Sequence, residues 1–139
     1  MSVTSFDHVA VPSADPVAMI RFYGALGFGV PDLDVFARED PLYFHIQFGD
    51  NKINVHTPKL WRNERFTLRG PAARPGCGDF CFVWSGTPDS LLLTMKQAGA
   101  QAIEGPVERA GGRGAGRELG SSVYSRDPDG NLLEFIIYQ

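Results

Sequence analysis

Four polar residues interrupt segments of the chain that are otherwise apolar. They are His8 in FDHVAV, His56 in INVHT, Asp79 in GDFCFVW and Glu134 in NLLEFII. A buried imidazole or carboxylate is costly unless it is paired or bound to a metal. Two imidazoles and two carboxylates form a mixed nitrogen and oxygen set, which suits Mn²⁺, Fe²⁺, Co²⁺, Ni²⁺ or Zn²⁺ rather than Ca²⁺. We therefore predict that these four side chains hold one divalent transition metal.

Each of the four also has a simpler interpretation. His8 taken alone is most simply a hydrogen-bonded core histidine, and Glu134 can be a strand-end carboxylate paired with Arg126. His56 ends its strand, where a histidine can simply be solvated. Asp79 can orient a ligand histidine or cap a loop instead of touching the metal.

The elements that must position these residues form a repeat. A strand followed by a helix is predicted twice, in residues 6–28 and 78–100. In both copies an N-cap residue precedes a proline, apolar residues follow at helical spacing, and a glycine ends the helix. The cap and the glycine are Asp15 and Gly27 in the first copy, and Thr87 and Gly99 in the second.

Three extended segments follow each predicted helix. They are 32–39, 42–49 and 51–57 in the first half, and 102–110, 121–127 and 131–139 in the second. The last pair joins through DPDGN, whose Asp-Gly step is a strong hairpin signal. The pattern predicts an α+β fold of two tandem βαβββ modules that form a curved-sheet cup. Module one spans 4–57, a connector 58–77 and module two 78–139.

Alternation along each strand separates two faces. The bulky apolar residues should face the helix of each module, and the polar residues should line the inside of the cup. Further polar residues of the predicted strands 42–49, 51–57 and 121–127 are expected to reach the same cup and contact a substrate. These are His45, Gln47, Asn54, Tyr124 and Arg126.

The paired modules resemble the vicinal oxygen chelate superfamily, which includes glyoxalase I, extradiol dioxygenases, fosfomycin-resistance proteins and bleomycin-binding proteins. The segments that carry the resemblance are FDHVAVPSADPVAMIRFYGALGF, FGDNKINVH, GDFCFVW and GPVERAGGRGAGRELGSSVYSRDPDGNLLEF. The resemblance implies one metal held by the first and last strands of each module, with Glu134 also acting as a base. It further implies a homodimer. Several of these relatives have a histidine where this chain has Asp79, which weakens the comparison with dioxygenases.

Two functions follow from these observations. The first is a metal-dependent lyase, isomerase or oxygenase that acts on a small molecule with vicinal oxygens. The second is a metal-free protein that sequesters a small molecule, as bleomycin-resistance proteins do. Tight binding of a transition metal discriminates between them.

Composition excludes other classes. The chain has 139 residues, a net charge of −3 and a pI near 5.5, so it lacks the basic surface that nucleic-acid binding needs. No apolar run approaches the length of a membrane helix, and the N-terminal residues do not have the pattern of a signal peptide. We therefore expect a cytoplasmic protein.

The remaining features receive structural interpretations. Cys77 and Cys81 are expected to be buried, inert thiols. The glycine-rich segment 111–120 is expected to be a mobile loop, although Arg109, Arg113 or Arg117 could instead grip an anionic substrate. The proline-rich, basic connector is expected to carry a short helix or cover the site. Its Lys59, Trp61, Arg62 and Arg65 are interpreted as surface or dimer contacts.

Overall fold

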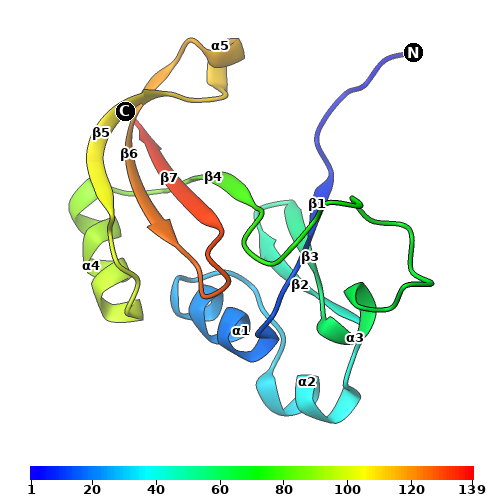
Figure 1. Ribbon diagram of the computed structural model, residues 1–139. Coiled ribbons are helices and arrows are strands. Elements are labelled where there is room, and N and C mark those ends of the chain that lie inside the picture. Colours follow the sequence, from blue (N-terminus) through cyan, green and yellow to red (C-terminus); the bar gives the residue numbers. More distant parts are fainter. The chain divides into compact units, whose positions relative to one another are not determined.

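The computed structural model describes residues 1–139, which form two compact units, 1–77 and 78–139 (Figure 1). None of the helices is long and apolar enough to cross a membrane. Unit 1 contains β1 (His8–Pro12), α1 (Pro16–Ala25), α2 (Leu33–Glu39), β2 (Tyr43–Phe48), β3 (Asn51–His56) and α3 (Pro58–Trp61). Unit 2 contains β4 (Asp79–Val83), α4 (Pro88–Ala98), β5 (Glu104–Ala110), α5 (Arg113–Gly116), β6 (Leu119–Arg126) and β7 (Leu132–Tyr138).

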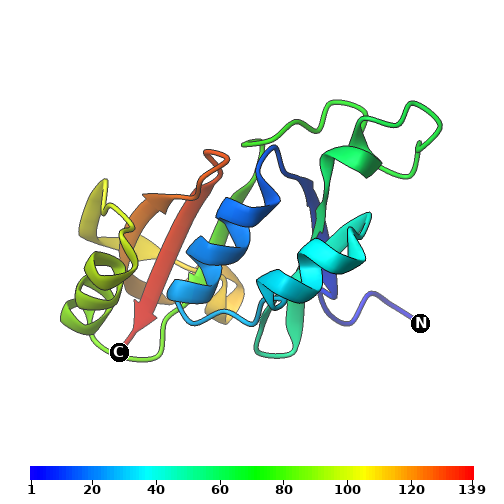
Figure 2. The same ribbon diagram turned by 90° about the horizontal axis from the view of Figure 1, so that it is seen from below.

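Unit 1 is built on a three-stranded sheet in the order β1-β3-β2, with β1 parallel and β2 antiparallel to β3. One face is apolar and buried, through Val11, Phe44, Ile46, Ile53 and Val55. Helices α1 and α2 lie on the same side of this sheet (Figure 2). Edge-to-face ring contacts connect both helices to β2, from Phe36 to Phe44 and from Tyr23 through Phe28 to Phe48. The predicted separation of apolar and polar faces is therefore confirmed in this unit.

The strand predicted for residues 32–39 is wrong, because these residues form helix α2. The Asp32 carboxylate accepts hydrogen bonds from the backbone N–H groups of Asp34 and Val35, at 2.9 and 3.0 Å. This cap satisfies donors that a helix start otherwise leaves free, and Asp40 ends the helix in the left-handed conformation. The module accordingly has three strands instead of four, and β2 becomes an edge strand.

Unit 2 has the predicted βαβββ order and a sheet in the order β4-β7-β6-β5. The side chains of Thr87 and Ser90 form a capping box at the start of α4. Trp84 Nε1 donates to Ser90 Oγ at 3.1 Å, and the Trp84 ring meets Phe135 edge-on, so the helix is tied to the apolar face of the sheet. The predicted hairpin at DPDGN is confirmed, since β6 and β7 are antiparallel neighbours.

A buried asparagine joins this hairpin to the start of β4. Asn131 Oδ1 accepts from the Gly78 N–H at 2.7 Å, and Asn131 Nδ2 donates to Asp127 Oδ2 at 2.7 Å. A Cβ atom on Gly78 would lie only 2.8 Å from Asn131 Oδ1, so the close approach requires glycine. Asp79 directly follows Gly78 in the chain. The contact between the hairpin and Gly78 therefore also fixes the position of Asp79 along the sheet.

We expect Asn131→Ala to lower the free energy of unfolding by about 1–3 kcal/mol, because it removes the acceptor of the part-buried Gly78 N–H and the side-chain donor to Asp127 Oδ2. Urea titration followed by circular dichroism measures the change. Gln97→Ala, on the exposed side of α4, serves as the control and should change stability by less than about 0.5 kcal/mol. Equal effects of the two substitutions would contradict the role given to Asn131.

Candidate functional site

The polar residues of unit 1 lie on the sheet face opposite the buried one, in three successive rungs. The first rung joins His8, Lys52 and Gln47. In the second rung, Asn54 lies between Ala10 and His45. In the third rung, His56 lies between Pro12 and Tyr43. The predicted substrate contacts His45, Gln47 and Asn54 thus share a face with both histidines.

The strand register separates His8 from His56. They lie four residues apart along the paired strands, which is about 13 Å at 3.3 Å per residue. Each ring also has its own contact: His8 Nδ1 lies 2.5 Å from Asp7 Oδ1, and His56 meets the Phe66 ring at 5.3 Å. Metal–nitrogen bonds are only about 2.0–2.1 Å long, so this ladder does not bring the two imidazoles to one ion.

Asn54 lies between them and carries an unsatisfied polar atom. Its Oδ1 is buried and has no hydrogen-bond partner. Such an atom is costly, and most buried polar atoms have a partner. The amide oxygen is therefore a candidate for contact with a bound group on this face.

Unit 2 repeats the relation between His8 and Asn54. Asp79 of β4 pairs with Leu132 of the parallel strand β7. Glu134 lies two residues after Leu132 on β7 and points to the same face as Asp79. In unit 1 Asn54 follows two residues after the partner of His8. By strand register, then, Asp79 is the equivalent of His8, and Glu134 is the equivalent of Asn54.

The sequence pattern predicts His56 as the counterpart of Glu134, but the strand register makes Asn54 that counterpart. The equivalent of His56 in unit 2 is Ile136, which lies opposite Val83 as His56 lies opposite Pro12. The prediction compared residues by their distance from the strand ends. Residues of the two units are equivalent, however, only when they pair with equivalent residues of the neighbouring strand. No local signal reports the register of two parallel strands that are distant in the chain.

Glu134 is half-buried and surrounded by hydrogen-bonding groups. Its Oε1 accepts from Ser122 Oγ at 2.5 Å, and the Tyr124 hydroxyl and Cys81 thiol interact with the same carboxylate. The Tyr124 hydroxyl in turn accepts from Arg109 Nε at 3.2 Å. Burial is the main cause that raises the pKa of Tyr124, so the phenol remains protonated near neutral pH. The predicted Tyr124 therefore lies beside Glu134 as a hydrogen-bond donor.

The expectation that both cysteines are buried is wrong, because Cys77 and Cys81 are exposed residues. Cys81 alternates with the buried Phe82 and so faces the polar side of the sheet, opposite Glu134. Although the Cys81 residue as a whole is exposed, its sulfur is partly buried, and this desolvation is the main cause that raises the pKa of Cys81 to about 12; the Glu134 charge adds to it. The thiol therefore stays protonated and is not a nucleophile at neutral pH.

The other basic and imidazole groups have defined surroundings. Lys52 Nζ lies 3.4 Å from His45 Nε2, and burial followed by the Lys52 charge lowers the pKa of His45. Burial is also the main cause that lowers the pKa of His56, and the Arg69 charge adds to it. Both imidazoles are thus favoured in the neutral form.

The arginines considered as substrate contacts make bonds within unit 2. Arg126 donates to the Gly130 carbonyl at 3.1 Å, inside the hairpin. Arg113 lies 3.8 Å from Glu118 and stacks over the Tyr138 ring. Arg117 donates to the Gly114 carbonyl, also within the 111–120 segment.

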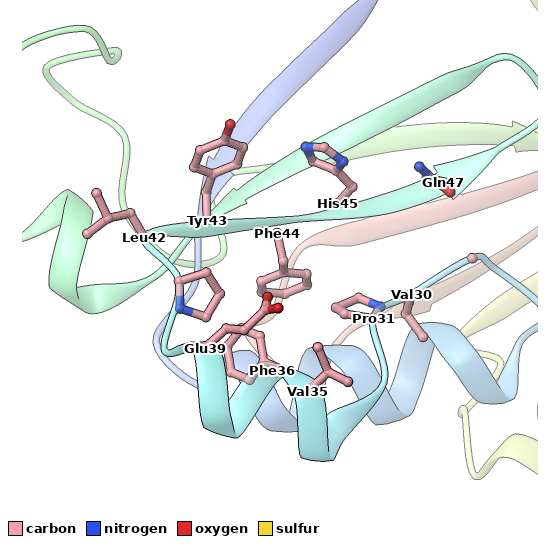
Figure 3. Close-up of a pocket in the computed structure, with 12 residues that line it drawn as sticks. Val30, Pro31, Val35, Phe36, Glu39, Leu42, Tyr43, Phe44, His45 and Gln47 are labelled. Atoms are coloured by element: carbon pink, nitrogen blue, oxygen red, sulfur yellow. The ribbon is translucent and has the colours of Figure 1, made fainter.

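A cavity of about 640 Å³ lies between β2 and α2 in unit 1. Phe36 and Phe44 point into it, whereas Tyr43, His45 and Gln47 extend from the other side of β2 (Figure 3). Tyr43, His45 and Gln47 also line the cavity, so it borders the polar face along β2. Within either unit, no three histidine, cysteine, aspartate or glutamate side chains gather as a metal site would require.

Comparison with known proteins gives a consistent result. Residues 5–135 match the model of the Glyoxalase/Bleomycin resistance protein/Dioxygenase superfamily. The chain is 34% identical to Virulence protein STM3117 of Salmonella typhimurium, covering 99% of this chain and 87% of that protein. It is 33% identical to Glyoxalase domain-containing protein RDO1 of Mycosarcoma maydis, covering 100% of this chain and 71% of that protein. The crystal structure of STM3117 matches with a TM-score of 0.80 at 33% identity, over the full length of both chains.

We expect Cys81 to react with iodoacetamide at pH 8 far more slowly than Cys77 in protein treated with EDTA. A thiol of pKa about 12 has a thiolate fraction on the order of 10³-fold below that of an ordinary cysteine. Peptide mass spectrometry over time measures both rates in one sample. Glu134→Gln should accelerate the reaction of Cys81, because it removes the adjacent negative charge, and leave Cys77 unchanged. Equal rates at the two cysteines would contradict the assigned surroundings.

Proposed function

Because the chain belongs to the Glyoxalase/Bleomycin resistance protein/Dioxygenase superfamily, we propose that it is a divalent-metal-dependent enzyme of small-molecule metabolism. Its substrate would carry vicinal oxygens, and its reaction would be of the lyase, isomerase or oxygenase type. One observation carries the proposal: the register places His8 and Asn54 in unit 1 in the same relation as Asp79 and Glu134 in unit 2.

The four residues fit a metal as a set of donors. They supply one imidazole, two carboxylates and one amide oxygen, and the amide oxygen of Asn54 is buried without another partner. Oxygen donors favour harder ions, and the imidazole favours iron, nickel or zinc, so Fe²⁺ or Mn²⁺ suits the mixture best. His56 is left out, because the register places it about 13 Å from His8 along the strands.

Glu134 is the proposed base. When bound, the metal would polarise the oxygens of the substrate and so acidify the neighbouring carbon or hydroxyl. Ser122 holds one carboxylate oxygen of Glu134 and thereby fixes the plane of the group. The carboxylate is then oriented to accept a proton from the substrate, and the Tyr124 hydroxyl can donate a hydrogen bond at the same place. Arg109 keeps that hydroxyl in position.

A second function is a metal-free binding protein for a small molecule. The observation that favours it is Lys52, which shares a rung with His8 on the polar face. An ammonium group beside a ligand histidine repels a metal cation. In this alternative Lys52 and His45 would instead contact a polar substituent of the ligand. A homodimer and a cytoplasmic location remain predictions for either function.

We expect protein purified without added metal or chelator to contain about one transition metal per chain, or to take up that amount on titration. His8→Ala and Glu134→Gln should each reduce metal content strongly, because each removes a charged or imidazole donor. Inductively coupled plasma mass spectrometry measures the ratio. His56→Ala is the matched control and should retain the metal, since register places it away from the set.

One result would count against the proposed function, and two would change its set of ligands. Metal below about 0.1 per chain with no uptake on titration would favour the metal-free binding protein. Loss of metal in His56→Ala equal to the loss in His8→Ala would restore His56 to the ligand set. Unchanged metal content in a folded Glu134→Gln variant, with folding checked by circular dichroism, would remove Glu134 from it.

A further inference from the structure

The connector 58–77 concentrates positive charge in an acidic chain. It holds five of the thirteen basic residues and one of the sixteen acidic residues, so the rest of the chain has a net charge of −7. The basic residues are Lys59, Arg62, Arg65, Arg69 and Arg74, and the acidic one is Glu64. Lys59 pairs with Asp40 at 2.7 Å, whereas the four arginines form no ion pair with a carboxylate. This local excess of charge attracts anions.

Two of these arginines meet at one tryptophan. The guanidinium carbons of Arg62 and Arg69 lie 5.0 and 5.7 Å from the centre of the Trp61 ring. Arg69 is half-buried, and its guanidinium donates only to the backbone carbonyls of Trp61 and Ala73. The aromatic ring attracts each cation but neutralises neither. Two like charges are therefore held close together without a counter-ion.

The same residues line a cavity of about 300 Å³. Arg62, Arg69 and Arg74 contribute to its wall together with Trp61 and Phe66, and Glu64 is the one acidic residue that lines it. Trp61 is fixed in place, because its Nε1 donates to the Ser13 carbonyl at 2.9 Å. A cavity of this size lies at the lower end of the range for ligand pockets, so it suits a compact molecule or one end of a larger one.

We propose that this cavity binds a small organic oxyanion that carries a planar apolar group. Guanidinium groups match the geometry of carboxylate and phosphate oxygens, and Arg62 and Arg74 retain unused donors at the wall. The indole of Trp61 and the ring of Phe66 offer apolar surface for the planar group. A bound anion would also remove the repulsion between the arginines. The site is independent of the proposed metal ligands.

The cavity lies next to the polar face of unit 1. Phe66 lines the cavity and also packs edge-on against the His56 ring, at 5.3 Å between ring centres. One side chain therefore separates the cavity from the third rung of the sheet. A ligand in the cavity would be one residue away from the face that carries His45 and Asn54.

Fluorescence titration with phenyl phosphate tests the proposal. The chain has only two tryptophans, Trp61 and Trp84, so Trp84→Phe leaves Trp61 as the sole reporter. We expect a saturable change in Trp61 emission at constant ionic strength, with phenyl phosphate binding more tightly than inorganic phosphate because of the planar group. Benzoate as a third probe shows whether carboxylates are also accepted. Chloride should produce no saturable change.

Arg62→Gln and Arg74→Gln should each weaken binding of phenyl phosphate by about tenfold or more, since each removes charge-assisted hydrogen bonds. Arg38→Gln is the matched control, because Arg38 is an exposed arginine of the same unit on α2. Calorimetric titration of the chain with both tryptophans intact repeats the measurement without the reporter substitution.

The proposal is overturned if phenyl phosphate produces no saturable signal up to about 10 mM by either method, well above the range of ordinary substrate affinities. It is also overturned if Arg38→Gln weakens binding as much as folded Arg62→Gln and Arg74→Gln do. Either result leaves the metal measurements unaffected, so failure of the anion site and failure of the proposed enzyme are distinguishable.

Discussion

The parallel pairing of the first strand with the last strand in each unit is the constraint on which the candidate site depends. Register decides which side chains share a rung, and a slip of one residue would move every side chain to the opposite face. Pairing of His8 with Lys52 brings Asn54, and not His56, into the position that corresponds to Glu134. The backbone hydrogen bonds between the paired strands therefore decide which polar side chains become neighbours on each face.

Contacts outside the polar faces maintain this pairing. In unit 2 the Leu132 N–H donates to the Gly78 carbonyl, while Asn131 accepts from the Gly78 N–H, so both backbone groups of one residue are held. In unit 1 the Ser13 N–H donates to the His56 carbonyl and extends the ladder beyond β1. Buried hydrogen bonds of this kind are costly to break, and they make the register specific. The surroundings of Glu134 are thus determined partly by residues that never touch it.

The connector has a structural role in addition to its charge. Trp61 donates to the Ser13 carbonyl, next to the end of β1, and Phe66 packs against His56. These contacts place an arginine-rich segment at one end of the polar face of unit 1. The interpretation of its basic residues as ordinary surface groups does not explain why Arg69 is half-buried with carbonyl acceptors alone. A guanidinium in that setting retains its full charge, and the proposed binding of an anion in the neighbouring cavity depends on that charge.

Sequence alone determined the repeated strand and helix, the two faces of each strand and the hairpin at DPDGN, because alternation, capping and turn chemistry depend on neighbouring residues. It did not distinguish a strand from a helix at residues 32–39, where alternating apolar residues compete with the cap at Asp32. Only the tertiary structure decided the register, since the partner of His8 is 44 residues away and that of Asp79 is 53 residues away. It also decided the state of Cys81, whose raised pKa comes from desolvation and from a carboxylate on another strand. Such long-range pairings depend on how the whole sheet packs, and no local pattern reports them.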